Sequence, residues 1–235
     1  MNVLTQPLTE ASCTENDAVC PWCTSRRKRC FDVALASLFL VLSAPLQILI
    51  CIVVKFSGQG PVIFRQLRTG RNGRLFTIYK YRTMKDEQDG NNSFVTRAND
   101  PRITKIGGIL RRTKMDELPQ LINILRGEMS IVGPRPRVPS QERRISLIRP
   151  GMTGIASLMF AHEERILQTV PEDAQEQYHA DILSPLKRHY DLRYSETATL
   201  SLDIEIIVRT AFKVYLSTAK EAIDPQPINF KAMQR

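Results

Sequence analysis

The residues of this sequence best suited to chemistry are two adjacent carboxylates, Asp116 and Glu117. They follow a cluster of cations, Arg111, Arg112 and Lys114. Apolar residues with helical spacing begin at Leu118, so the pattern predicts a helix that Thr113 caps and whose first turn holds Asp116. The positive end of such a helix and the nearby cations would favour the ionised form of Asp116. An ionised aspartate in that position can attack phosphorus or bind a metal ion.

A second interpretation of the same two acids stays open at this point. An acidic residue three places after a threonine is common at ordinary helix starts. Asp116 and Glu117 would then only cap the helix and balance the neighbouring positive charges.

The distribution of charge points to an anionic partner. The chain has 235 residues, a hydrophobic share of 43%, a charged share of 24% and a net charge of +9. This composition is ordinary for a folded protein of one or two domains. The positive excess lies in residues 26–85, where twelve Lys and Arg residues accompany a single acid, Asp32. Lipid head groups, phosphates or nucleic acid would supply the complementary charge.

Residues 33–54 form a segment of 22 residues without a charge. About 20 apolar residues suffice for a helix to cross the hydrocarbon core of a bilayer. A buried helix of a soluble protein rarely lacks a polar face over that length. Pro45 lies near the middle and is expected to break the helix, with Ser43 satisfying backbone groups that the proline frees. An apolar segment of this kind argues against nucleic acid as the partner.

Two topologies are open for this segment: a kinked helix that spans the bilayer, and a re-entrant helix that returns to the face it entered. Basic residues flank it on both sides, at positions 26–29 before it and from Lys55 onwards after it. Because basic flanks tend to stay in the cytoplasm, the charges favour the re-entrant form. We therefore expect a re-entrant, Pro-broken membrane helix at residues 26–55.

A β-hairpin is predicted over residues 61–84. Two β-rich runs, 62–67 and 75–81, flank a turn that contains Asn72-Gly73, a strong hairpin signal. Lys80 and Arg82 are two positions apart, so an extended strand would place both side chains on one face. Such a pair suits a phosphate group, but it also occurs on an ordinary solvated basic face.

Two turns rich in Gly and Pro present further arginines. The first, residues 133–137, fixes Pro134 and presents Arg135 and Arg137. The second begins at Arg149 and runs to residue 154. A rigid turn that presents a guanidinium suits bidentate binding of phosphate, although surface ion pairs would use the same residues.

The remaining segments are helices and tails. Residues 162–194 have a mostly helical pattern, and residues 200–216 suit an interfacial amphipathic helix as well as a packed one. Residues 1–25, which lack the apolar core of a signal peptide, and residues 221–235 are expected to be flexible tails. Cys20 and Cys23 form a CxxC that could bind metal with Cys13 and Cys30, but a tail without metal is favoured.

Together, these motifs resemble the bacterial sugar transferase family, the monotopic polyprenyl-phosphate phosphoglycosyl transferases. The matching stretches lie in order between about residue 28 and residue 216. They are Phe31-Asp32, Val-Ile-Phe-Arg-Gln at 62–66, Tyr-Lys-Tyr-Arg-Thr-Met at 79–84, Asp-Glu-Leu-Pro-Gln-Leu at 116–121, Asn123, Gly127, Met-Ser-Ile-Val-Gly-Pro-Arg-Pro at 129–136, Arg-Pro-Gly-Met-Thr-Gly at 149–154, Tyr190-Asp191 and Ser201-Leu202-Asp203.

The resemblance implies a fold and a reaction. The fold would be a compact, helix-rich α/β (α+β) membrane-associated domain with a β-hairpin and interfacial amphipathic helices, in which residues 56–220 are catalytic. The reaction would move a sugar 1-phosphate from a UDP-sugar to polyprenol (undecaprenyl) phosphate, release UMP and initiate polysaccharide or glycoconjugate assembly. It would take place at the cytosolic face of the bacterial inner membrane. Asp116 would form a covalent phospho-sugar intermediate, and Glu117 would assist in binding Mg²⁺ beside it.

The resemblance also favours a role for the cations in neutralising phosphate charge. The expected substrate-binding residues are Lys80, Arg82, Arg111, Pro134, Arg135, Arg137 and Arg149. The donor sugar, the pathway and homo-oligomerisation are left open. Two other functions also stay open: a membrane-anchored phosphatase with an aspartate nucleophile, and a non-catalytic basic protein of the membrane surface.

Overall fold

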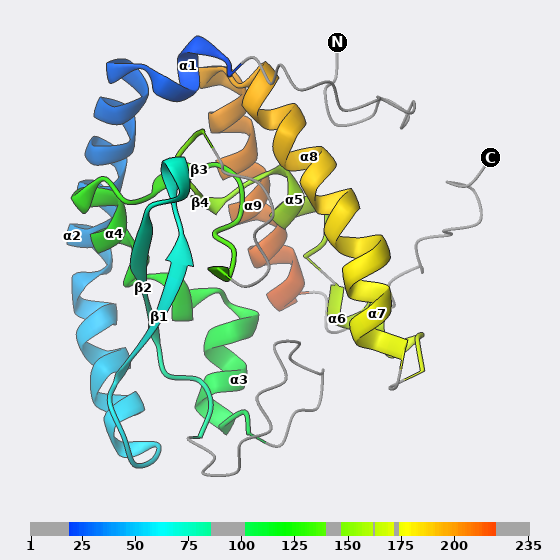
Figure 1. The fold of residues 1–235 in the computed structure, drawn as a ribbon. Helices are drawn as coiled ribbons and strands as arrows, with labels where there is room; N and C mark the ends of the chain where they lie inside the picture. The colour runs from blue at the N-terminus through cyan, green and yellow to red at the C-terminus, as the bar shows by residue number, and fades with distance from the viewer. Residues whose placement is uncertain (1–18, 86–101, 140–146, 162, 172–173, 220–235) are drawn as a thin grey trace.

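The chain folds into helices that surround two small β-sheets (Figure 1). The computed structural model describes residues 19–85, 102–139, 147–161, 163–171 and 174–219. Within these ranges, the expected helix-rich α/β architecture with one long apolar N-terminal helix and a β-hairpin is confirmed. The tail predicted at 221–235 and most of the one predicted at 1–25 lie outside the described residues.

The elements follow one another along the chain in the order α1 (Pro21–Thr24), α2 (Arg26–Phe56), β1 (Ile63–Thr69), η1 (Arg71–Gly73), β2 (Leu75–Tyr81), α3 (Lys105–Arg112), η2 (Met115–Glu117), α4 (Gln120–Arg126), β3 (Ser130–Val132), β4 (Gly151–Thr153), α5 (Ile155–Met159), α6 (Glu163–Gln168), α7 (Gln175–Tyr178), η5 (His179–Leu183), α8 (Ser184–Thr197) and α9 (Leu200–Ala219). The elements η1 and η2 are 3₁₀ turns, and η5 is a short π-helix.

The helix α2 is continuous through Pro45, where a break was expected. Proline has no N–H, so the carbonyl of Val41 loses its helical donor. The Ser43 hydroxyl donates to the carbonyl of Phe39 (2.5 Å) and accepts a hydrogen bond from Gln47 (2.8 Å). Ser43 therefore does not take over the bond that the proline removes, and the helix continues through Pro45 on its other backbone bonds.

Length and composition alone would allow α2 to cross a membrane, and no other helix of the described ranges passes that test. Its large apolar side chains are mostly exposed. They are Leu38, Phe39, Val41, Leu42, Leu46, Ile48, Leu49, Ile52 and Phe56. A contiguous exposed apolar surface marks a site of contact with a membrane or another protein.

Both ends of α2 are attached to the same body, along whose side the helix lies (Figure 1). Near the start, the buried carboxylate of Asp32 accepts hydrogen bonds from the Ser130 hydroxyl (3.0 Å) and the Ile131 N–H (3.1 Å) of β3. Near the end, Val54 is buried against Tyr81 of the hairpin. The helix is therefore held to the body at two points on either side of its apolar centre.

The antiparallel pair β1–β2 confirms the predicted hairpin, with Gln66 opposite Ile78. Asn72 (φ 57°) and Gly73 (φ 72°) take the left-handed conformation that closes the turn. Ile78 is buried, and Lys80 shares its face because alternate residues of a strand point the same way.

Asn123 fastens α4 to this hairpin. Its buried side chain donates to the carbonyl of Thr77 (2.7 Å) and accepts from the N–H of Tyr79 (3.2 Å). The helix α4 begins three residues after Glu117. The position of Glu117 is therefore fixed relative to the strand that carries Lys80.

The two turns rich in Gly and Pro pack backbone against backbone. A Cβ atom on Gly151 would lie 2.1 Å from the nitrogen of Gly133, and one on Gly154 would lie 2.3 Å from its oxygen. The N–H of Gly151 donates to the carbonyl of Pro134 (2.8 Å). The rigid turns expected from the sequence therefore support each other through contacts that only glycine permits.

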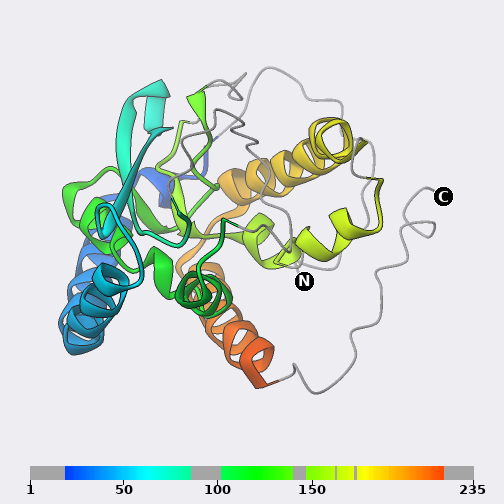
Figure 2. The same ribbon diagram turned by 90° about the horizontal axis from the view of Figure 1, so that it is seen from below.

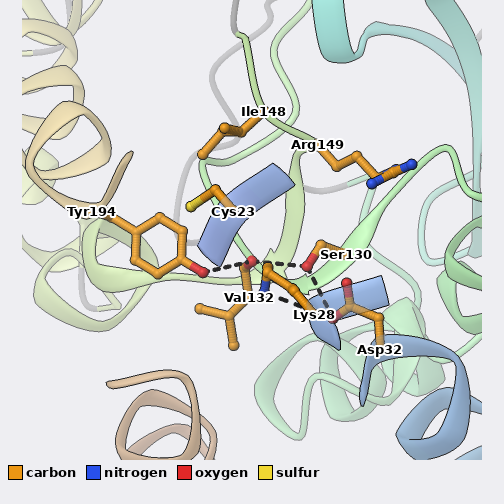
Figure 3. Close-up of a pocket in the computed structure, with 8 residues that line it drawn as sticks. All are labelled: Cys23, Lys28, Asp32, Ser130, Val132, Ile148, Arg149 and Tyr194. Atoms are coloured by element: carbon orange, nitrogen blue, oxygen red, sulfur yellow. Dashed lines mark hydrogen bonds and ion pairs between the residues drawn. The ribbon is translucent and has the colours of Figure 1, made fainter. Parts of the chain in front are cut away.

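Residues 19–25 belong to the folded body rather than to a flexible tail. Cys23 is 5% exposed, and the indole N–H of Trp22 donates to Asp203 (2.9 Å). Asp203 also pairs with Lys28 (2.8 Å) and accepts from the Tyr194 hydroxyl (2.6 Å). Figure 3 shows Cys23, Lys28 and Tyr194 around the pocket that they line. The expected boundary at residue 25 is corrected because these buried polar contacts bind the segment to α9.

The CxxC contributes to packing in this structure. The Cys20 thiol donates to the carbonyl of Ala198 (2.9 Å), and the described cysteines are free thiols. The described part of the chain holds no group of three or more His, Cys, Asp or Glu residues that could bind a metal ion. Cys13, the fourth member of the metal site considered, lies outside the described residues.

Two neighbouring glycines of α3 provide a test of the packing. A Cβ on Gly107 would lie 2.0 Å from the carbonyl oxygen of Thr83, whereas one on Gly108 would meet a methyl group of Ile103 at 3.9 Å. Gly107→Ala should lower the free energy of unfolding by about 2 kcal/mol or more, because backbone must move. Gly108→Ala should leave it unchanged or raise it by up to about 1 kcal/mol, because alanine favours helix. Thermal unfolding in detergent compares the two, and equal losses would contradict the contact.

Candidate active site

The dyad, Asp116 and Glu117, lies in a short turn between two helices. The helix α3 ends before Thr113, whose hydroxyl donates to the carbonyl of Ile109 (2.9 Å). Lys114 then takes the left-handed conformation (φ 58°), and η2 holds both acids. The expectation that Thr113 caps a helix starting at the dyad was wrong. A left-handed residue separates Thr113 from the turn that holds the dyad, and the spacing of apolar residues does not reveal a left-handed residue.

The strand β2 brings Lys80 to the dyad. Its Nζ lies 2.7 Å from Oε1 of Glu117, and the two side chains are 21% and 15% exposed. Water screens such a half-buried pair less than a surface pair, so the attraction is stronger. Lys80 thus fixes the carboxylate of Glu117 and compensates its charge.

The two acids of the dyad differ in their electrostatics. Burial raises the pKa of Glu117, but Lys80, Arg135 and Lys114 outweigh it and hold that pKa at about 2. Burial first, and then the charge of Glu117, raises the pKa of Asp116 above its usual range despite the nearby cations. The expectation that a helix end and the cations keep Asp116 ionised is therefore corrected, because the residue is not at a helix start and desolvation dominates.

One carboxylate oxygen of Asp116 is buried and unpaired. The residue is 8% exposed, and its Oδ1 has no hydrogen-bond partner. Leaving a buried polar atom unpaired costs roughly 1–3 kcal/mol, and more for a charged group. Mg²⁺ binds through one or two carboxylates and completes its shell with phosphate and water oxygens. The unpaired oxygen and the adjacent carboxylate of Glu117 therefore fit the expected ion.

Further cations surround the dyad. Arg111 and Lys114 lower the pKa of Asp116, and Arg135 lowers that of its neighbour, which places all three close by. The Arg135 side chain is exposed, and the preceding Pro134 is fixed by its bond from β4. Of the expected substrate-binding residues, the structure thus places the lysine of β2, Arg111 and Arg135 near the dyad, and Pro134 directly precedes the last of them.

Arg82 does not lie with them. Its guanidinium donates to the carbonyls of Val54 (3.0 Å), Gly58 (2.8 Å) and Pro61 (3.0 Å), and the residue is 6% exposed. A cation at these carbonyls joins the last turn of α2 to the segment that follows the helix. The expectation that Arg82 shares a face with Lys80 was wrong, because β2 ends one residue before Arg82 and the alternation ends with it.

Arg149 and Arg137 also have partners away from the dyad. The Nε of Arg149 donates to the carbonyl of Gly127 (2.9 Å), at the C-terminal end of α4. Arg149 lines the pocket of Figure 3, whose labelled residues do not include the dyad. Arg137 lies 3.4 Å from Asp191 of α8. The geometry assigns both arginines contacts within the fold.

Arg68 is a residue near the dyad that sequence reasoning missed. In the sequence, Arg68 was noted only as one of the basic residues that follow the apolar segment. Burial and the charge of Arg135 lower the pKa of Arg68 to about 10, whereas Glu117 raises it, so the guanidinium lies near both. The sequence did show its position along the predicted strand. Only the strand register, however, reveals that its side chain lies on the face turned toward the dyad.

The chain is similar to known bacterial proteins. The family described as "Bacterial sugar transferase" matches residues 23–217. A UDP-glucose:undecaprenyl-phosphate glucose-1-phosphate transferase of Escherichia coli (strain K12) is 39% identical over 206 residues, which are 82% of this chain and 41% of that protein. A protein of the same name from Caulobacter vibrioides is 38% identical over 195 residues, with coverages of 78% and 68%.

A third relative has a length closer to that of this chain. The exopolysaccharide production protein PSS of Rhizobium leguminosarum bv. phaseoli is 38% identical over 198 residues, which are 78% of this chain and 92% of that protein. By contrast, this chain matches 41% of the length of the Escherichia coli relative. The similarity therefore covers one part of that longer protein.

The role of Arg82 at the end of α2 can be tested by stability. Arg82→Met should lower the free energy of unfolding by about 2 kcal/mol or more, because one carbonyl in the last turn of α2 and two in the segment after it lose a charged donor. Arg74→Met, at an exposed position of the same hairpin, should change it by less than about 0.5 kcal/mol. Thermal unfolding of both variants in one detergent measures the difference. A stable Arg82→Met protein would show that the three bonds matter little.

Proposed function

This chain belongs to the bacterial sugar transferase family, and we propose that it transfers a sugar 1-phosphate from a UDP-sugar to undecaprenyl phosphate and releases UMP. Two relatives carry the names of glucose-1-phosphate transferases that use UDP-glucose and undecaprenyl phosphate. The observation that carries the proposal is the buried, unpaired oxygen of Asp116 beside the ion pair of Glu117 and Lys80. A carboxylate held in this way suits attack on phosphorus.

In the first step, an oxygen of Asp116 attacks the phosphorus atom that carries the sugar. A bond forms between these two atoms, and the bond from phosphorus to the bridging oxygen of the diphosphate breaks. The bridging oxygen takes the electron pair and leaves as part of UMP. The sugar phosphate is then attached to Asp116 as an acyl phosphate.

In the second step, a phosphate oxygen of undecaprenyl phosphate attacks the same phosphorus atom. The bond from phosphorus to Asp116 breaks, and the carboxylate recovers its electron pair. The product is undecaprenyl diphospho-sugar, and the enzyme returns to its starting state. Two displacements at one phosphorus explain why a single nucleophile can serve both substrates.

The surrounding residues provide charge neutralisation, which is the main requirement of phosphoryl transfer. Lys80 holds Glu117, while Arg111 and Arg135 offer positive charge to phosphate oxygens. Asp116 and Glu117 would hold Mg²⁺, which supplies further positive charge to the phosphates and favours the ionised form of Asp116. These contributions come from separate elements that converge on one turn.

A membrane location at the cytosolic face of the bacterial inner membrane is part of the proposal. Seen from below, α2, α3 and α9 lie along one side of the body (Figure 2). Exposed apolar side chains occur on all three helices, and those of α9 recur every fourth residue: Leu200, Ile204, Val208 and Phe212. Such a surface fits contact with lipid.

The topology proposed for α2 is re-entrant in the sense that both of its ends stay on the cytosolic side. Both ends contact the same body, through Asp32 at the start and Val54 at the end. Both flanks are basic, which favours the same side of the bilayer. A helix that crossed the bilayer would separate its two attachment points by about 30 Å of hydrocarbon.

The nucleophile assignment predicts a large effect of one substitution. The purified protein with UDP-glucose, undecaprenyl phosphate and Mg²⁺ should release UMP, and Asp116→Asn should lower the rate by about 10³-fold or more, because an amide cannot replace the nucleophile. Asp181→Asn, at an exposed position of η5, is the matched control and should be fully active. Without the lipid, intact-mass spectrometry should detect a hexose phosphate on the wild type and none on Asp116→Asn.

Two results would count against this mechanism. Release of inorganic phosphate instead of UMP would favour the phosphatase alternative. Unchanged turnover in Asp116→Asn would remove Asp116 as the nucleophile.

Chelation of Mg²⁺ should stop UMP release, and the addition of Mg²⁺ should restore it.

The topology predicts one-sided labelling. In a cysteine-free background, Arg27→Cys and Gln59→Cys place single thiols at exposed positions on the two flanks of α2. A membrane-impermeant maleimide should label neither thiol in intact spheroplasts and both in inside-out vesicles. Labelling of one position from each side would show that α2 crosses the bilayer.

A further inference from the structure

Arg68 lies on the face of the hairpin that is turned toward the dyad. It pairs with Phe76, four residues before Lys80 on β2. Paired residues and alternate residues share a face of a sheet, so Arg68, Gln66 and Lys80 point the same way. Lys80 contacts Glu117. The strand register therefore directs the Arg68 side chain to the side of the hairpin on which the dyad lies.

The guanidinium of Arg68 is held in place by one hydrogen bond, but one of its other nitrogens has no hydrogen-bond partner. Its Nη2 donates to Oε1 of Gln66 (2.5 Å), which fixes the orientation of the group. Its Nε is buried and has no hydrogen-bond partner. Within the described residues, the only other buried side-chain nitrogen or oxygen without a partner is Oδ1 of Asp116. A donor without an acceptor and an acceptor without a donor thus occur in the same site.

The charges around Arg68 are also unbalanced. Burial and the like charge of Arg135 lower the pKa of Arg68, and Glu117 offsets this only in part, since the pKa remains near 10. Glu117 is already paired with Lys80 at 2.7 Å. The guanidiniums of Arg68 and Arg135 therefore lie near one carboxylate, that of Glu117, which is already paired with Lys80. An anion between the two guanidiniums would relieve their repulsion.

We propose that Arg68 binds a phosphate group of a substrate in the active site, with Gln66 as the residue that positions it. The inference rests on the proposed function and adds a phosphate-binding residue to it. The Nε–H and the free edge of the guanidinium donate to phosphate oxygens in the fork geometry that suits this group. Both the nucleotide diphosphate and the lipid phosphate offer that chemistry, and the test distinguishes them.

A purely structural role explains Arg68 less well. A buried arginine that serves stability has its donors paired, because unpaired buried charge costs free energy. Here the direct partner is a neutral amide on the same strand, two residues away. Arg68→Gln should therefore leave the unfolding temperature unchanged or raise it, whereas a structural arginine would lower it.

The test compares two arginines of one strand. Arg68→Gln removes the half-buried guanidinium, and Arg65→Gln removes an exposed one from the opposite face of β1. Calorimetry with UDP as the probe measures the donor side, and the KM for undecaprenyl phosphate measures the lipid side. Arg68→Gln should weaken one of the two by about tenfold to a hundredfold, the cost of a lost charged hydrogen bond. Arg65→Gln should change both by less than about twofold.

The outcomes separate this inference from the proposed function. Weaker UDP binding assigns Arg68 to the donor diphosphate, and a higher KM for the lipid assigns it to the acceptor phosphate. An active wild type whose Arg68→Gln variant keeps both values overturns the inference and leaves the proposed function intact. If the wild type shows no turnover, the proposed function fails, and binding of UDP that depends on Arg68 still supports a phosphate site.

A second variant guards against loss of folding. Arg68→Lys keeps the charge on a side chain that is one atom shorter, but it lacks Nε and the planar fork. It should retain the unfolding temperature and recover only part of the lost affinity. Full recovery in Arg68→Lys would show that charge alone acts at this position and would overturn the role given to Nε.

Discussion

Two adjacent carboxylates in a buried turn repel each other and lose their hydration, so they need positive charge within a few ångströms. Lys80 supplies the direct contact, 2.7 Å from Glu117. The other cations come from α3, from the turn at 134–137 and from β1. Because each belongs to a different element, the site exists only when the hairpin, α3 and the two glycine-rich turns are docked. The buried side chain of Asn123, which joins α4 to β2, sets this relative placement.

The same logic of compensated buried charge attaches the apolar helix to the body. At one end of α2, Lys28 pairs with Asp203, and Asp32 accepts bonds from β3. At the other end, Arg82 donates to the carbonyl of Val54 in the last turn of the helix and to that of Gly58 just beyond it. An apolar helix that is fixed by polar contacts near both ends, and that exposes one side between them, can offer that side to lipid. These contacts would also hold the dyad at a set depth relative to that lipid.

Family membership and geometry support one chemical picture by independent routes. The family match covers residues 23–217, nearly the whole described chain. The structure contributes the unpaired oxygen of Asp116 and the unpaired Nε of Arg68, which are the buried polar atoms that lack partners in the described residues. Atoms of this kind are costly unless a ligand meets them. A phosphate ester with its cation would satisfy both atoms, so the cost of leaving them unpaired supports the proposed reaction.

The sequence alone determined the features that depend on local pattern. The uncharged run at 33–54 predicted a long apolar helix, Asn72-Gly73 predicted the hairpin turn, and the pair Asp116-Glu117 indicated the chemistry. The tertiary structure alone decided which charged side chains meet. Lys80 reaches Glu117, whereas Arg82, two residues on, turns to the end of α2. Spacing places residues on an element, but burial and the choice of partner depend on how distant elements dock, and this also decided that desolvation raises the pKa of Asp116.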